Sequence, residues 1–122
     1  MAAIIAALGV VLGAFGAHKL QEIITDQKLL NSWETGVRYQ MFHAIGIALV
    51  GIIQSQFKAK IFNTSIILFL LGIILFSGSI YTLVLLKATS SIGLGGLGII
   101  TPIGGVLLVL AWVLTAIGLT KK

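Results

Sequence analysis

The chain has 122 residues, of which 58% are hydrophobic and 9% charged, with no cysteine and a net charge of +5. A soluble core of this size is too small to bury so much apolar surface, so we expect lipid to surround much of the chain. The absence of cysteine excludes disulfides, thiol catalysis and cysteine-based metal sites. The basic residues lie near the ends of apolar stretches, which indicates membrane anchoring rather than binding to nucleic acid.

Four apolar stretches are long enough, or nearly so, to cross hydrocarbon as helices, which takes roughly 20 residues each. The sequence therefore predicts an all-α membrane protein, a four-transmembrane-helix bundle in a single integral membrane domain over residues 1–122. The spans cover about residues 2–20, 39–57, 64–86 and 99–119. A signal peptide is the alternative for the first stretch, but no basic residues precede its apolar run, so we expect a retained span.

Two of the spans carry small residues at helical spacing, which allows close approach to another helix. In the first span they are Ala6, Gly9, Gly13 and Gly16, and in the fourth they are Gly104, Ala111, Thr115 and Gly118. For the first span, the spacing does not separate packing within the chain from self-association.

Between the first two spans, residues 20–38 alternate apolar and polar positions with helical period. This pattern predicts an amphipathic helix, or two short ones, lying along the membrane surface as an interfacial helix. Asn31 followed by Glu34 resembles a capping box, so a fresh helix is expected to begin near Ser32 and to run into the second span. Glu34 and Arg38 are one turn apart and are expected to pair.

The polar residues near the span ends lie at one end of the molecule if the spans alternate in direction. These residues form a predicted polar cluster of His18, Trp33, Glu34, Arg38, Tyr39, His43, Ser77, Ser79, Tyr81 and Thr101. Polar groups in hydrocarbon are energetically expensive and tend to mark function, so we expect a binding pocket closed by the segment from His18 to Arg38. The alternative is that the serines and the tyrosine hydrogen-bond to neighbouring backbone.

Catalysis, metal binding and proton pumping have little support in the sequence. Two histidines without a cysteine fall short of a metal site, so neither a metal nor a cofactor is expected. No carboxylate follows Glu34, which argues against a proton relay, and no serine sits in a nucleophile motif, so we expect no enzyme. Thr101 and Pro102 resemble a helix start, whose free amides with Arg38 nearby would suit an anion.

The basic residues also bear on orientation, because they favour the cytoplasmic side. Each side carries four of them: Lys58, Lys60, Lys121 and Lys122 on one, and Lys19, Lys28, Arg38 and Lys87 on the other. The first set is denser, so both termini are expected in the cytoplasm.

Four motifs in order along the chain identify a family resemblance. They are Gly13-Ala14-Phe15-Gly16-Ala17-His18, Tyr39-Gln40-Met41-Phe42-His43-Ala44, Leu75-Phe76-Ser77-Gly78-Ser79-Ile80-Tyr81 and Ile100-Thr101-Pro102-Ile103-Gly104-Gly105. Together they resemble the domain-of-unknown-function 423 family, or uncharacterised protein family 0382, small bacterial inner-membrane proteins related to transmembrane protein 256. The resemblance implies four membrane helices with the termini inside, and no known activity. Two features depart from the family pattern: Lys19 replaces an expected glycine, and the last loop, from Lys87 to Gly98, is rich in glycine.

The function expected from these observations is a non-enzymatic binding or accessory module in the bacterial cytoplasmic membrane. It would hold a lipid, a small ligand or a partner helix at the polar cluster, in the outer leaflet. The expected partners are membrane lipids, with a homo-oligomer or a membrane-protein partner as further possibilities, and no nucleic acid. The alternative is a small oligomeric transporter or channel.

Overall fold

The computed structural model describes residues 1–89 and 96–120, and its regular structure there is helical throughout. The helices are α1 (Ala2–Ala17), α2 (Lys19–Ile23), α3 (Gln27–Phe57), α4 (Lys60–Ala88) and α5 (Leu97–Thr120). Four helical stretches are long and apolar enough to cross a membrane, namely α1 with α2, α3, α4 and α5. The predicted all-helical membrane class is confirmed, whereas much of the predicted glycine-rich loop lies outside the described residues.

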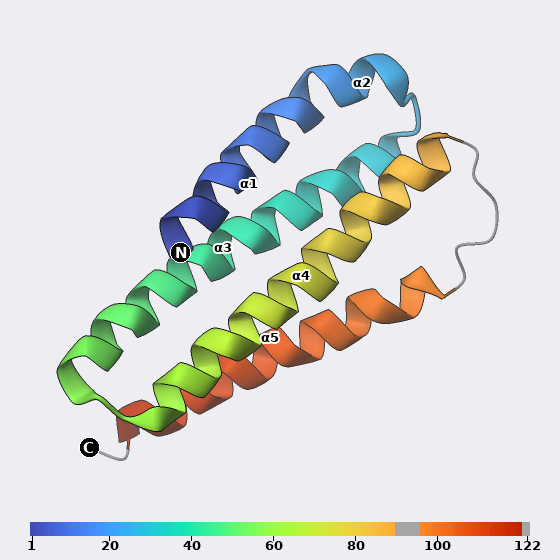
Figure 1. Cartoon of the computed structure of the whole chain (residues 1–122). Coiled ribbons are helices and arrows are strands. Elements are labelled where there is room, and N and C mark those ends of the chain that lie inside the picture. The colour runs from blue at the N-terminus through green and yellow to red at the C-terminus, as the bar shows by residue number, and fades with distance from the viewer. Residues whose placement is uncertain (90–95, 121–122) are drawn as a thin grey trace.

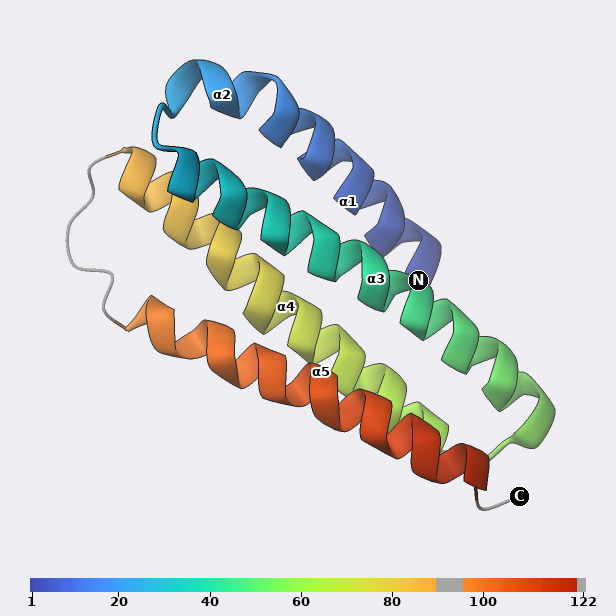
Figure 2. The same cartoon turned by 180° about the vertical axis from the view of Figure 1, so that it is seen from behind.

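The long helices lie side by side in the order of the chain, each antiparallel to the next (Figure 1). The view from behind shows the same order, with α1 and α5 on opposite flanks of the central pair α3 and α4 (Figure 2). The link before α3, the C-terminal end of α4 and the N-terminal end of α5 lie at one end of the molecule, and the α3–α4 link lies at the other. The bundle is therefore an open row of helices in which the predicted polar residues gather toward one end.

The small residues of α1 face α3. A Cβ atom on Gly9 would lie 2.6 Å from the Met41 sulfur, and one on Gly16 would lie 2.5 Å from Cδ1 of Trp33. Real Cβ atoms do not come so close to their neighbours; the flexible Met41 side chain could move away, but the Trp33 ring at Gly16 leaves room only for glycine. In the described structure, this stripe therefore serves packing within the chain.

The small residues of α5 face α4 in the same way. All four predicted positions are buried: Gly104, Ala111, Thr115 and Gly118. A Cβ atom on Gly118 would lie 2.6 Å from Cε1 of Phe62, and Gly104 meets the backbone of α4 itself. The contact between α4 and α5 is accordingly the most extensive in the molecule.

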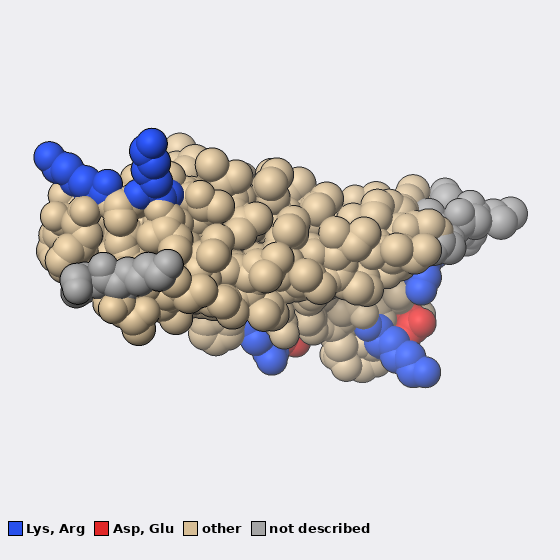
Figure 3. Space-filling view, turned by 90° about the horizontal axis from the view of Figure 1, so that it is seen from below, with Lys and Arg blue, Asp and Glu red and all other residues tan. Residues whose placement is uncertain are grey.

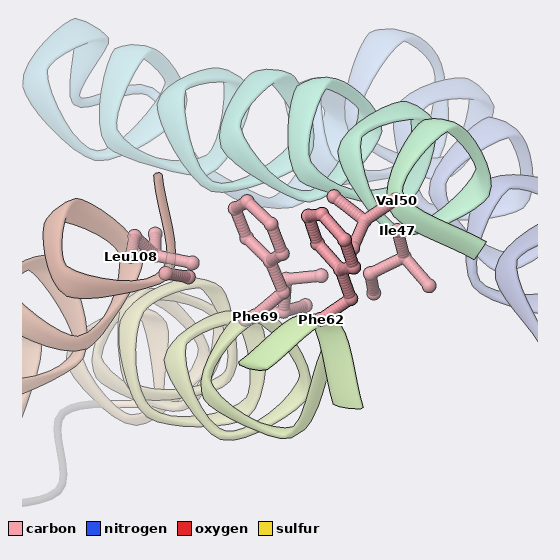
Figure 4. Packing of buried hydrophobic residues seen from close by; sticks show 7 residues of the cluster. Ile47, Val50, Phe62, Phe69 and Leu108 are labelled. Carbon is pink, nitrogen blue, oxygen red and sulfur yellow. The ribbon is translucent and has the colours of Figure 1, made fainter. Parts of the chain in front are cut away.

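Two apolar clusters hold the row together, one toward each end. The first joins α3, α4 and α5 through Ile47, Val50, Phe62, Phe69, Ile73, Leu108 and Ala111 (Figure 4). The second, near the polar end, consists of Leu20, Ile24, Trp33, Ile80 and Val84. Many large apolar side chains outside these clusters are exposed, as expected for helices surrounded by lipid.

The segment before the second span differs from the prediction, because it is not a separate surface helix. Only α2 is a short independent helix, and α3 already begins at Gln27. Asp26 caps it, since its carboxylate accepts a hydrogen bond from the Lys28 amide at 2.8 Å. Trp33 and Gly36 are buried against other helices. Residues 27–38 are therefore continuous with the helix of the predicted second span, and the predicted capping box at Asn31 is wrong.

The predicted helix start at Thr101 and Pro102 is also wrong. Helix α5 begins at Leu97, so Pro102 lies inside it and the amides that follow belong to a helix already formed. The Thr101 hydroxyl bonds to Ser79 instead of capping the helix. The anion site expected at this helix start therefore has no geometric basis.

Candidate functional site

The structure divides the predicted polar cluster into three groups. Some members hydrogen-bond between helices, two belong to an aromatic wall beside α5, and two form an ion pair on the outside of α3. The exposed His18 is separate from all three, at the junction of α1 and α2.

The first group fastens α1 to α3 and α4. The Trp33 indole Nε1 donates to the Leu12 carbonyl at 2.9 Å. The Tyr81 hydroxyl donates to Oε1 of Gln40 at 2.9 Å, and Nε2 of Gln40 donates to the Ile5 carbonyl at 2.9 Å. The rings of Trp33 and Tyr81 also lie 4.6 Å apart between centroids. Both carbonyls belong to α1, Trp33 and Gln40 belong to α3, and Tyr81 belongs to α4. These contacts therefore fix the positions of the three helices along one another.

Gln40 is the residue of this group that sequence reasoning missed. It is 5% exposed and links Tyr81 to α1. Its position seven residues after Trp33 places both side chains on one face of α3, two turns apart. That spacing, together with an amide inside an apolar span, is the signal that would have indicated it.

The hydroxyl groups of α4 are also used within the molecule. Ser77 donates to the Gly36 carbonyl at 2.8 Å and so joins α4 to α3. Ser79 lies 2.6 Å from the Thr101 hydroxyl, which joins α4 to α5, and also bonds its own helix at Phe76. In the described residues, every fully buried side-chain nitrogen or oxygen has a partner. Ser77 and Ser79 thus bond to backbone carbonyls, as the alternative expected, whereas Ser79 also bonds to the Thr101 side chain and Tyr81 bonds to the Gln40 side chain.

The second group is aromatic. Tyr39 stacks on Phe76 with 4.4 Å between ring centroids. The His43 ring packs beside Phe69 and Trp112, which also contact each other, and its Nδ1 is 2.6 Å from the Tyr39 carbonyl. His43 and His18 are not brought together, and no three potential metal ligands meet among the described residues.

The third group is an ion pair on the outer face of α3, the exposed surface that carries Asn31, Glu34 and Arg38. The Arg38 guanidinium lies 3.1 Å from the Glu34 carboxylate, as the spacing predicts. The two side chains are 60% and 68% exposed, respectively. Unlike the hydroxyl groups, this pair remains available to a ligand.

Measured along the helix axes, the ion pair lies well away from Lys19 and Lys87, the charged residues at the polar end of the neighbouring helices. Val37 packs against Gly13, which precedes Lys19 by six residues, a rise of roughly 9 Å. On the other side, Gly36 packs against Ile80, which precedes Lys87 by seven residues, or roughly 10 Å. Figure 3 shows basic side chains toward both ends of the molecule and a basic group beside an acidic one between them.

A crevice of about 300 Å³ opens beside the ion pair, between α1, α2 and the first turns of α3. Its apolar side is formed by small residues of α1 and by Leu30 and Val37. Its polar side chains are Gln21, Gln27, Asn31 and Glu34. The crevice thus offers amides and a carboxylate over an apolar floor, which suits an amphiphile.

Comparison with known proteins gives a consistent match. The family model described as "Protein of unknown function (DUF423)" matches residues 12–105. The UPF0382 membrane protein YwdK of Bacillus subtilis is 40% identical over 122 residues, covering 99% of this chain and 94% of that protein. UPF0382 membrane proteins of Haemophilus influenzae and Schizosaccharomyces pombe are each 38% identical, over 93% and 92% of this chain and 85% and 92% of their own lengths. No solved structure matches.

Proposed function

We propose that this chain, which belongs to the DUF423 family of membrane proteins, is a non-enzymatic binding module that holds a lipid headgroup on α3. The exposed ion pair of Glu34 and Arg38 carries the proposal. It lies roughly 10 Å along the helices from Lys19 and Lys87, at a level where α1 and α4 carry no charged side chain.

The energy of this ion pair depends on what covers it. Placing a single Arg or Asp at the centre of a membrane helix costs about 2.5–3.5 kcal/mol on insertion scales. Pairing reduces this cost, and so does snorkelling of the side chains toward the membrane surface. Even so, more than half of the surface of each side chain is exposed. A polar partner drawn down to this level would replace the missing hydration.

The charges indicate which headgroup would fit. The Arg38 guanidinium would bind a phosphate through two parallel hydrogen bonds, the geometry that arginine favours. Glu34, one turn away, would attract an ammonium group, and the crevice amides would bond to ester oxygens. This pairing of opposite charges matches a zwitterionic phospholipid such as one with an ethanolamine headgroup.

The proposal keeps the orientation that the basic residues favour. The α3–α4 link with Lys58 and Lys60 would face the cytoplasm of a bacterial cell, and the binding site would face the outer leaflet. A transporter gains no support from the fold, because the described helices form an open row. A partner helix or a second copy of the chain is the competing occupant.

Native mass spectrometry of the protein released from nanodiscs tests this function. The nanodiscs contain equal amounts of phosphatidylethanolamine and phosphatidylglycerol. We expect the wild-type protein to retain ethanolamine lipid, Arg38→Gln to lose at least about tenfold in retention, and Glu34→Gln to lose the preference between the lipids.

A second ion pair provides the matched control. Lys19 and Glu22 lie 2.8 Å apart and are 66% and 65% exposed, but they belong to α2 at the end of the molecule. Lys19→Gln and Glu22→Gln should leave lipid retention unchanged. Equal losses from both pairs, or retention of a second protein chain in place of lipid, would contradict the proposal.

A further inference from the structure

A second groove lies on the other side of α3, where that helix meets α5. It has a volume of about 500 Å³, within the usual range of ligand pockets of roughly 300–1,000 Å³. Its walls are aromatic and apolar, with Tyr39 and Phe42 from α3 and Trp112 from α5. Tyr39 and Trp112 carry hydrogen-bond donors, and His43 lies among them as the side chain whose ring nitrogen can accept a hydrogen bond without donating one.

The hydrogen bonding of His43 fixes which of its ring nitrogens carries a proton. Nδ1 lies 2.6 Å from the Tyr39 carbonyl oxygen. A carbonyl can only accept, so Nδ1 must be the donor. In the neutral ring, which hydrocarbon surroundings favour, Nε2 is then an unprotonated acceptor.

Nε2 has no partner among the described residues, although His43 is only 8% exposed. All fully sealed side-chain nitrogens and oxygens in the described part of the chain are hydrogen-bonded. Nε2 is therefore not sealed, and the surface that His43 reaches is the groove. A nine-tenths buried imidazole thus presents a free acceptor to an apolar groove.

We propose that this groove binds a hydroxylated aromatic lipid, such as a quinol or another phenol with an apolar tail. The phenolic hydroxyl donates to Nε2 of His43, and the ring stacks against Trp112 or Phe42. The apolar tail continues along the open, lipid-facing side. An aliphatic lipid without a donor lacks the hydrogen bond, and a charged headgroup has no counter-charge among the groove's lining residues.

Two ligands that differ only in the donor test this site. The first is 4-nonylphenol, and the second is its methyl ether, which keeps the ring and tail but cannot donate. In nanodiscs, we expect the phenol to bind several-fold and up to about tenfold more tightly than the ether, the value of one hydrogen bond. Equal affinities for the two ligands would overturn the proposal.

Nitrogen NMR locates the hydrogen bond, because the chain has two histidines, His18 and His43. With ¹⁵N-histidine labelling, the phenol should move the Nε2 resonance of His43 and leave that of the exposed His18 in place. The ether cannot donate a hydrogen bond, so it should not produce this shift in the Nε2 resonance of either histidine. A shift of both histidines, or of neither, would contradict binding at Nε2.

A variant separates the hydrogen bond from the shape of the groove. His43→Phe keeps a flat ring beside Phe69 and Trp112 but removes the acceptor. It should bind the phenol and the ether with equal affinity, and its free energy of unfolding should be compared with that of the wild type. If the folded variant still prefers the phenol, the assignment to His43 is wrong.

Discussion

At Gly104, helices α4 and α5 approach so closely that only a hydrogen atom fits on the Cα atom. A Cβ atom there would lie 2.4 Å from the Phe76 backbone nitrogen and 2.8 Å from the Leu75 carbonyl carbon. Backbone atoms cannot rotate away as the end of a flexible side chain can. Gly105, the next residue, has its nearest neighbour at 3.6 Å, an ordinary contact.

The change Gly104→Ala should therefore destabilise the protein, by about 1–3 kcal/mol as for other overpacked sites. The measurement is the free energy of unfolding in a denaturing detergent titration. Gly105→Ala is the matched control, and should be neutral or stabilising because alanine favours helix. Equal destabilisation by both changes would argue against this close contact.

The hydrogen bond between Tyr81 and Gln40 is a second residue-scale test. Tyr81→Phe should lower the free energy of unfolding by about 0.6 kcal/mol, and at most by about 1.7 kcal/mol, the range for hydrogen bonds in membrane proteins. A double-mutant cycle with Gln40→Leu measures the coupling. Thr82, which bonds only its own helix, gives the control change Thr82→Val. The coupling energy between Tyr81→Phe and Gln40→Leu should exceed the coupling energy between Thr82→Val and Gln40→Leu. Equal coupling energies would contradict the hydrogen bond.

At the scale of single elements, helix α3 shows what periodicity can and cannot predict. The helical period of residues 20–38 is visible in the sequence, and so is the pairing of Glu34 with Arg38, because both follow from local spacing. Whether the apolar face meets lipid or protein depends on distant residues. Gly16 receives the Trp33 ring, and Gly36 receives Tyr81. Those contacts bury Trp33 and Gly36 against other helices, in a segment that is continuous with the helix of the predicted second span.

The start of α3 can be tested by comparing two possible caps. Asp26→Ala should destabilise the protein by about 0.5–2 kcal/mol, because the Lys28 amide loses its partner. Amide hydrogen exchange should rise in the first turn of α3 and stay unchanged beyond it. Asn31→Ala removes only an exposed side-chain bond to Gln27 and should have little effect. The reverse order of effects would place the helix start at Asn31.

At the scale of the whole molecule, the number of spans could be predicted, but their arrangement could not. Apolar length alone indicates four membrane helices. The small residues at Gly9 and Gly118 show that close neighbours exist without naming them, since glycine carries no side chain that selects a partner. The bond from Tyr81 to Gln40 likewise joins helices whose register no local pattern specifies. For this reason the sequence could place the polar cluster at one end of the molecule. It could not separate the residues that hydrogen-bond between helices from the ion pair on the outer face of α3.

The outer ion pair links this architecture to the proposed function. The row leaves the outer face of α3 uncovered in one chain, so Glu34 and Arg38 point away from the other helices. If the neighbouring spans cross the membrane as their length indicates, the pair needs polar cover. We propose that a lipid phosphate bound at Arg38 provides this cover.

Solid-state NMR of the protein in liposomes tests this claim most directly, because Arg38 is the only arginine in the sequence. With ¹⁵N-arginine labelling, a single guanidinium can be probed for dipolar coupling to the ³¹P of the lipids. We predict coupling at hydrogen-bonding distance, with an unchanged signal in Glu22→Gln. The absence of coupling in the folded wild-type protein would contradict the account.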